Sequence, residues 1–493
     1  MELELRILLI SVVTLGSVFF IILFRRNAVP AFTCIWLLVP KLGTNLFGIY
    51  EIPLFSFVEL ACSLTLLVVV LGVSRNSNLL TLQSYSARSL MQLEIFVIAF
   101  FILVSAQQVV SSMFFLYARD LGSPIPPGRV FVGIVKDFSS IVFLVACYKL
   151  IFTMKQVERC LLIFIFVLII LAAELAAVTW IGPVKNFIGK YSFDGFGRFN
   201  SIFINDYNLF GLVCAVGGLS ALHFFRKNIR GVWILLFLIA TLLVIFNLKR
   251  NMIFAYFSGA VVFWYAGYFQ RWSFWKRVML IVTTAVSILL LNFNQLNLPG
   301  IDARDYIENE YISKRVANYA NLDSIKVRMG IQLRAFEVIV DKFPFGVGKN
   351  MLRYHMGANS PQIFKISDSV VLDGYNRVAN GNVVTEAHNG YLEFIASYGL
   401  LGFFALLLLI STIARNLLKA RFTFHSQDSL YPLGLSISVL FGIYYLFLGY
   451  PQFYLVVFLL LHLSFLLARE SYGKNLPQSR GKMTWSNRLI PPS

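Results

Sequence analysis

A short polar stretch, TEAHNGYLEF at residues 385–394, places a histidine and an asparagine directly before a long apolar run. A histidine titrates near neutral pH, so it can take a proton from a substrate hydroxyl and act as a general base. His388 is therefore a candidate catalytic residue. The alternative is that His388 only caps the helix that follows. The elements around this stretch decide which substrates can reach it.

The composition is that of a membrane protein. The chain has 493 residues, of which 58% are hydrophobic and only 13% are charged, whereas soluble proteins carry roughly 25% charged residues. Runs such as residues 160–178 and 400–414 are long enough, with their flanks, to cross about 30 Å of hydrocarbon. We therefore predict an all-α, polytopic transmembrane fold. The net charge of +18 is explained by basic cytoplasmic loops, so we expect no nucleic-acid partner.

Hydropathy predicts about 12 or 13 membrane-spanning helices. They lie near residues 5–24, 31–49, 52–73, 91–117, 129–150, 160–182, 201–222, 231–247, 252–269, 277–293, 391–414, 430–449 and 453–468. The first resembles a signal peptide but carries an acidic flank, so we expect it to be retained. The five cysteines fall in or beside apolar spans, which indicates neither a disulfide framework nor a metal cluster.

The charges of the loops orient these helices. Residues 225–230, 271–277 and 415–421 and the tail from Arg469 are strongly basic, and basic loops stay in the cytoplasm. The long segment between residues 294 and 389 must then lie outside. The chain thus divides into an N-terminal bundle (1–293), a large outer loop (294–389), C-terminal membrane helices (390–468) and a basic cytoplasmic tail (469–493).

The outer loop is predicted to contain a helix. Residues 324–343 carry apolar side chains at i, i+4 and i+8, which is the spacing of an amphipathic helix, and the turn PFGVGKN (344–350) ends it. We expect this segment to lie on the membrane surface as a lid. The turn NLKRN (247–251) also falls outside, where basic residues are unusual. Its side chains either serve the function or reach lipid headgroups.

This topology separates the five histidines. His223 and His425 are predicted to lie in cytoplasmic loops and His462 in the middle of the last span. Only His355 and His388 are then available to the outer face, and only His388 stands at the start of a membrane helix.

The stretch HNGYLEFIASYGLLGF (388–403) resembles the hallmark of the O-antigen ligase/polymerase family, roughly H-N-x-[YF]-L-x(6)-G-x-x-G. The turn PFGVGKN resembles the family's P-x-x-G-V-G element, and Arg328 lies near the start of the preceding helix. GRFNSIFINDYNLFG (197–211) resembles another element, with Ser201 in place of the usual glycine. In NLKRN only Arg250 matches the family's Ser-Arg-Gly signature. The resemblance covers about residues 195–410, in the family's order.

The resemblance implies an enzyme of the bacterial cytoplasmic membrane with its active site on the periplasmic or outer face. Members of the family transfer a glycan from an undecaprenyl-pyrophosphate carrier to an acceptor sugar. His388 would then deprotonate the acceptor hydroxyl. Asn389 would orient His388 or hold a sugar. Glu386 would tune the histidine through its negative charge, or it is simply a solvated acid.

The pyrophosphate leaving group needs a cation. Many transferases supply a divalent metal held by a D-x-D motif, and this chain contains none. Arg198, Arg250 and Arg328 are expected to bind the phosphate oxygens instead, because a guanidinium group binds them with two parallel hydrogen bonds. We therefore expect no metal and no cofactor. Gly346, Gly348, Gly399 and Gly402 are assigned to turn geometry and close helix packing.

Three functions remain open at this point. A polymerase would join one lipid-linked repeat to another, with a chain-length regulator as a candidate partner, and the length of the protein favours this function. A ligase would pass the glycan to lipid A–core or to a protein. A lipid-linked oligosaccharide flippase is the alternative from another class, but no internal repeat is visible of the kind that transporters show.

Overall fold

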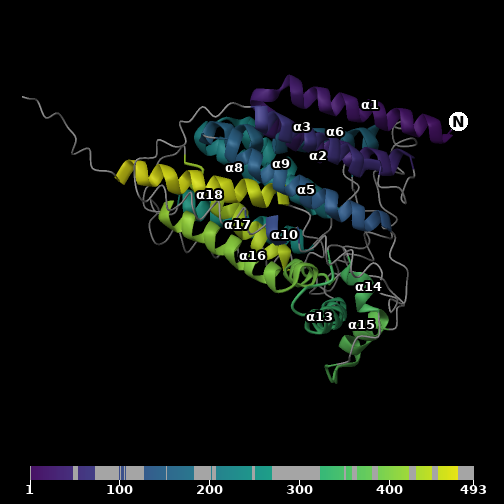
Figure 1. The fold of residues 1–493 in the computed structure, drawn as a ribbon. Coiled ribbons are helices and arrows are strands. Elements are labelled where there is room, and N and C mark those ends of the chain that lie inside the picture. The colour runs from purple at the N-terminus through teal and green to yellow at the C-terminus, as the bar shows by residue number, and fades with distance from the viewer. Residues whose placement is uncertain are drawn as a thin grey trace, which may run out of the picture.

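The computed structural model shows a bundle of long helices with a smaller group of helices at one end (Figure 1). It describes residues 2–47, 54–72, 99, 102–104, 106, 127–151, 153–181, 201, 207–246, 250–268, 323–348, 351–357, 363–379, 387–420, 429–446 and 454–475. All regular structure in these residues is helical, which confirms the predicted all-α fold.

The bundle corresponds closely to the predicted spans. In the described residues it consists of α1 (Glu2–Leu23), α2 (Ala28–Phe47), α3 (Leu54–Gly72), α5 (Pro127–Leu150), α6 (Met154–Trp180), α8 (Tyr207–Lys227), α9 (Gly231–Phe246), α10 (Arg250–Tyr268), α16 (Gly390–Ala420), α17 (Tyr431–Tyr445) and α18 (Tyr454–Asn475). A short 3-10 helix, η1 (Arg25–Asn27), joins α1 to α2. The predicted span 277–293 lies outside the described residues, and only isolated residues of 91–117 lie within them.

The helices of the bundle confirm a polytopic membrane protein. By length and composition, four described helices can each cross a membrane: segments of α5, α6 and α8, and the whole of α16. The helices on either side of η1 pass the same test only together, and they meet at an angle of 88°. The two spans predicted near residues 5–24 and 31–49 therefore form one bent pair. Several shorter apolar helices complete the described bundle.

The smaller group consists of α13 (Asp323–Asp341), α14 (Leu352–Met356) and α15 (Ser369–Ala379), hereafter the α13–α15 group. The amphipathic helix predicted at 324–343 is confirmed as α13. Its apolar face forms a core with α14, α15 and the start of α16. α13 and α15 can approach closely because each has a glycine at the contact, Gly330 and Gly374. A Cβ atom on either glycine would collide with the backbone of the other helix. The group is thus a packed unit and not a loose loop.

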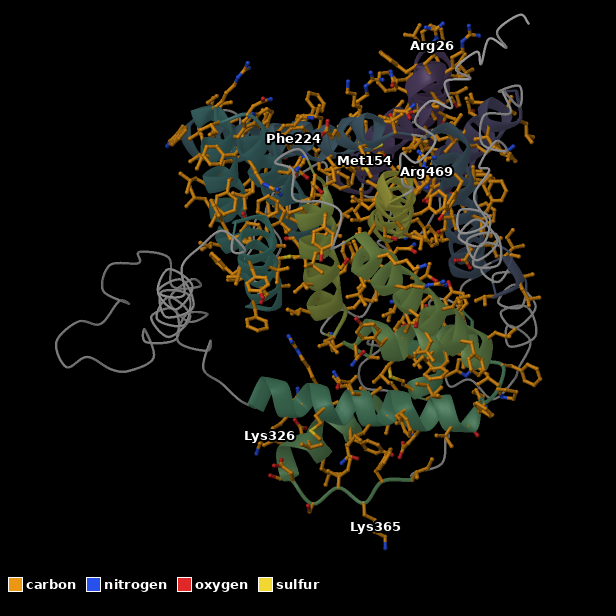
Figure 2. The ribbon with its side chains drawn as sticks, turned by 90° about the vertical axis from the view of Figure 1, so that its left-hand side faces the viewer. Arg26, Met154, Phe224, Lys326, Lys365 and Arg469 are labelled. Atoms are coloured by element: carbon orange, nitrogen blue, oxygen red, sulfur yellow. The ribbon has the colours of Figure 1, made fainter. Side chains whose placement is uncertain are left out.

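Basic residues gather at one end of the bundle, with Arg25 and Arg26 in η1 and Arg226 and Lys227 in the last turn of α8. Figure 2 shows Arg26, Met154, Phe224 and Arg469 at one end and Lys326 and Lys365 of the α13–α15 group at the other. At the first end Arg159 Nη1 donates to Asn27 Oδ1 at 2.9 Å, and Lys227 Nζ donates to Glu158 Oε1 at 2.7 Å. These contacts gather η1, the start of α6 and the end of α8.

The C-terminal helices join the same basic end. Asn416 of α16 donates from Nδ2 to Ser464 Oγ of α18 at 3.3 Å, and His462 Nε2 lies 2.8 Å from the Ile151 carbonyl oxygen at the end of α5. The start of α16, which follows His388, must therefore lie at the opposite end. The basic segments near residues 225–230 and 415–421 share one end, as the charge pattern predicts, and 271–277 lies outside the described residues.

Candidate functional site

Asn389 caps the first turn of α16. Its Oδ1 accepts hydrogen bonds from the backbone N–H groups of Tyr391 at 3.1 Å and Leu392 at 3.2 Å. An asparagine at this position satisfies amides that a helix leaves without partners. His388 comes just before the cap and has a φ of 51°, which is unusual for a residue other than glycine. The capping oxygen is therefore that of Asn389, and His388 lies in a left-handed turn before the helix.

A buried carboxylate accepts a hydrogen bond from the backbone of this turn. Glu393, one turn into α16, is 5% exposed, and its Oε2 accepts the N–H of Ala387 at 3.2 Å. The Glu393 N–H in turn donates to the Asn389 carbonyl oxygen at 2.9 Å. The residue before His388 is thereby tied to the helix after it. Sequence reasoning did not select Glu393, although an acid in an apolar helix start is a visible signal.

Helix α13 reaches the same turn. Gln332 Nε2 donates to the carbonyl oxygen of His388 at 3.5 Å. Arg328 is half-buried and lies one turn before Gln332, and residues four apart share a face of a helix. Arg328 is therefore on the face of α13 that meets the His388 turn. The structure brings these two predicted residues, far apart in sequence, to the same end of the molecule.

The turn after α13 forms backbone hydrogen bonds with α16 where α16 is interrupted. Gly399 interrupts α16 with φ 62° and ψ −147°. The turn fills the break with three backbone hydrogen bonds: Val347 N–H to Ala396 O (2.8 Å), Gly348 N–H to Ser397 O (2.9 Å) and Leu400 N–H to Pro344 O (2.8 Å). The two motifs PFGVGKN and HNGYLEFIASYGLLGF thus form one joint.

Two glycines make this joint possible. Gly346 and Gly399 both have positive φ, and a Cβ on either would collide with the backbone of the other segment. Their assignment to turn geometry and close packing is confirmed, but their packing is against each other. This contact between residues 53 positions apart in number was not predicted.

A buried ion pair holds the α13–α15 group together. Arg334 Nη1 lies 2.7 Å from Glu337 Oε2, and the Tyr375 hydroxyl donates to the same oxygen at 2.6 Å. The amides of Ile363 and Phe364 donate to Glu337 Oε1. Burial alone would raise the pKa of Glu337, but these hydrogen bonds outweigh it and lower the pKa. The sequence analysis did not select this ion pair, although an arginine and a glutamate three positions apart in an amphipathic helix could have indicated it.

The second histidine of this region is a core residue. His355 in α14 is only 3% exposed, so it is not available at the surface as predicted. Burial, followed by the positive charge of Lys342, lowers its pKa to about 4. His355 is therefore neutral near pH 7. His223 also departs from its prediction, because it lies buried within α8 and not in a loop.

The structure describes only some of the remaining predicted site residues. Arg250 is the first residue of α10, and α10 ends near the basic end, where Gly267 lies beside Arg226. Arg250 therefore lies at the end of the bundle that carries His388. Arg198 and Glu386 lie outside the described residues. Among the described residues no group of three or more metal-binding side chains is found.

Comparison with protein families matches residues 234–407 to the family described as "O-Antigen ligase". The matched segment runs from α9 through α10 and the α13–α15 group to the first half of α16. It contains Arg250, Arg328, Glu393 and both halves of the joint around Gly346 and Gly399. No curated protein matches the chain.

Proposed function

Because the segment from residue 234 to residue 407 belongs to the O-antigen ligase family, we propose that this membrane protein transfers a glycan from undecaprenyl pyrophosphate to an acceptor sugar. Family membership implies a lipid-linked glycan donor and an acceptor. The observation that carries the proposal is the contact of Gln332 with the His388 carbonyl oxygen. It brings α13, with a cationic side chain at Arg328, over the turn that holds a histidine at the end of a membrane helix.

The proposed reaction uses His388 as the base. The His388 ring accepts the proton of the acceptor hydroxyl while the hydroxyl oxygen bonds to the anomeric carbon of the donor glycan. The bond from that carbon to the phosphate oxygen breaks, and undecaprenyl pyrophosphate leaves with the electron pair. Arg328 and Arg250, with Arg198, stabilise the charge that develops on the leaving group. This chemistry calls for no metal and no cofactor.

An apolar groove supports a lipid carrier. It is lined by α16, α17 and α18 and runs from Tyr391, beside the Asn389 cap, to Leu418 near the other end of α16. After the break at Gly399 the lining of α16 runs from Leu406 to Leu418, about 18 Å at 1.5 Å per residue. The Tyr391 hydroxyl donates to the Gly442 carbonyl oxygen at 3.0 Å and joins the two sides of the groove. We propose that the isoprenoid chain of the carrier lies along this apolar surface.

The proposed side of the membrane rests on the basic end of the bundle. The basic end is proposed to face the cytoplasm, which places the α13–α15 group and His388 on the periplasmic side of the inner membrane. A cysteine at Lys365, an exposed position of that group, should react with an impermeant thiol reagent in cells with a permeabilised outer barrier. A cysteine at Arg415 should not. The opposite pattern would place His388 in the cytoplasm and end the proposal.

We propose polymerase activity ahead of ligase activity, and a flippase as the remaining alternative. Deleting the gene and separating surface glycans and lipid-linked intermediates on a gel distinguishes them. Loss of a polymerase leaves glycans of single-repeat length on the surface. Loss of a ligase leaves long glycans on the lipid carrier, whereas loss of a flippase leaves single repeats inside the cell. A chain-length regulator is a partner only in the first case.

A further inference from the structure

The Ala387–His388 turn is held from three directions. Asn389 caps the helix after it, Gln332 donates to the His388 carbonyl oxygen, and Glu393 accepts the Ala387 N–H. Ala387 is fully buried, so water cannot replace the acceptor for its amide. The Glu393 bond is the one that closes the turn on its N-terminal side.

Glu393 is suited to hold this turn. A carboxylate in the first turn of a helix is stabilised by the helix dipole, and a hydrogen bond to a charged acceptor is stronger than one between neutral groups. The bond is needed because His388 has a left-handed backbone, a conformation that costs free energy and persists only when its surroundings enforce it. A change at Glu393 therefore acts on the backbone that carries the His388 ring.

We propose that Glu393 is a positioning residue, whose carboxylate fixes the Ala387–His388 turn so that the His388 ring meets the acceptor hydroxyl. The proposal rests on the proposed role of His388 as the base. In this role the Glu393 carboxylate bonds to the Ala387 amide and does not contact the substrate. A misplacement of a reacting group by about 1 Å costs on the order of 10²-fold in rate.

Two conservative substitutions separate reach from charge. Glu393→Gln keeps the length and an acceptor oxygen but loses the charge. Glu393→Asp keeps the charge but is one methylene too short to reach Ala387. Glu393→Gln should keep kcat within about 10-fold of the unaltered protein, because only the charge-assisted part of the hydrogen bond is lost. Glu393→Asp should lower kcat on the order of 10²-fold, with KM for the lipid-linked donor within about 3-fold.

The measurement is glycan transfer by the full-length protein in proteoliposomes with a lipid-linked donor. The opposite ranking, with Glu393→Asp active and Glu393→Gln inactive, would overturn the proposal, since charge and not reach would then matter. Equal activity of both variants with the unaltered protein would overturn it too.

A double substitution tests whether Glu393 acts through His388. In a His388→Ala background, Glu393→Asp should lower the residual turnover less than about 2-fold, because there is no ring left to position. A full further loss in that background would show a general effect on folding and overturn the proposal. If His388→Ala alone keeps normal turnover, the proposed function fails instead, and the two failures are thereby distinguished.

Asp368 provides a control for the type of bond, at a more exposed position. Its Oδ1 accepts the N–H groups of Val370 at 2.9 Å and Val371 at 3.2 Å, so it also holds a helix start in the α13–α15 group, but at α15. Asp368→Ala should leave kcat within about 2-fold. If it lowers kcat as far as Glu393→Asp does, loss of any carboxylate–amide bond in this region has the same effect and Glu393 has no special role.

Discussion

The membrane bundle and the α13–α15 group are held together by different kinds of contact. The bundle has a large apolar core, with occasional polar bonds such as Tyr398 to Asp137 at 3.0 Å and Ser436 to the Gly259 carbonyl at 2.5 Å. The α13–α15 group has a small apolar core, supplemented by a buried ion pair and by backbone bonds to α16.

This difference suits different tasks. Apolar packing is roughly proportional to area and has little directionality, which is sufficient for a scaffold. Hydrogen bonds fix distances and angles, which a catalytic group requires. Directed hydrogen bonds hold the turn of His388 and the joint at Gly399. The predictions below test whether the two regions depend on these contacts to different degrees.

The largest effect is expected at the buried ion pair. Glu337→Ala leaves Arg334 as an uncompensated buried charge, which typically costs 3–5 kcal/mol. The free energy of opening of residues 323–379 should fall by about that amount, as measured by hydrogen exchange. Ser436→Ala in the bundle should cost only about 1 kcal/mol. Similar losses at the two sites would contradict the contrast between the regions.

The α13–α15 group should also be sensitive to acid. The pKa of His355 is lowered to about 4 in the folded chain from 6.5, so the unfolded state binds the proton more tightly. Stability should therefore fall as the pH drops from 6.5 toward 4, by up to about 3 kcal/mol. The lowered pKa of Glu337 acts in the same direction at lower pH.

His355→Gln serves as the comparison for this pH effect. The variant removes the titrating ring, so its unfolding free energy should depend less on pH between 6.5 and 4. A pH dependence equal to that of the unaltered protein would show that His355 is not the source. At neutral pH the variant should keep its turnover, because no substrate contact is proposed for His355.

His388→Ala should lower turnover on the order of 10²-fold or more, the usual contribution of a general base. Donor binding should change little, because the proposed pyrophosphate contacts come from arginines. Hydrogen exchange of α13 and α16 should be unaffected. Near-normal turnover in this variant would remove His388 from the mechanism.

Arg328→Ala should weaken donor binding and turnover together, each by about 10-fold, because a phosphate contact made in the ground state strengthens as the leaving group charges. Arg328→Lys should restore part of the loss, since an ammonium group lacks the paired donors. Arg250→Ala should likewise weaken donor binding and turnover together. Lys326 on the same helix, exposed and paired with Asp368 at 2.7 Å, is the control, and Lys326→Ala should change neither quantity.

The smallest effect is expected from metal removal. Glycan transfer by the purified protein should survive EDTA, because arginines are proposed to stabilise the leaving group. Loss of activity that magnesium or manganese restores would contradict that role for Arg198, Arg250 and Arg328.

The sequence by itself determined the membrane class, most helix positions and the candidate histidine. These follow from local properties: apolar length marks a span, helical periodicity marks α13, and a polar stretch at a helix start marks His388. The sequence also predicted the shared end of the basic segments near 225–230 and 415–421, because loop charge sets helix orientation.

Only the tertiary structure decided which polar residues meet. Nothing local indicates that Gln332 reaches the His388 carbonyl oxygen or that the turn at Gly346 packs into the break at Gly399. His355 and His388 have the same side chain, yet one is buried in a core and the other lies in the turn before α16. The burial of a side chain and its hydrogen bonds to distant segments depend on how the whole chain packs.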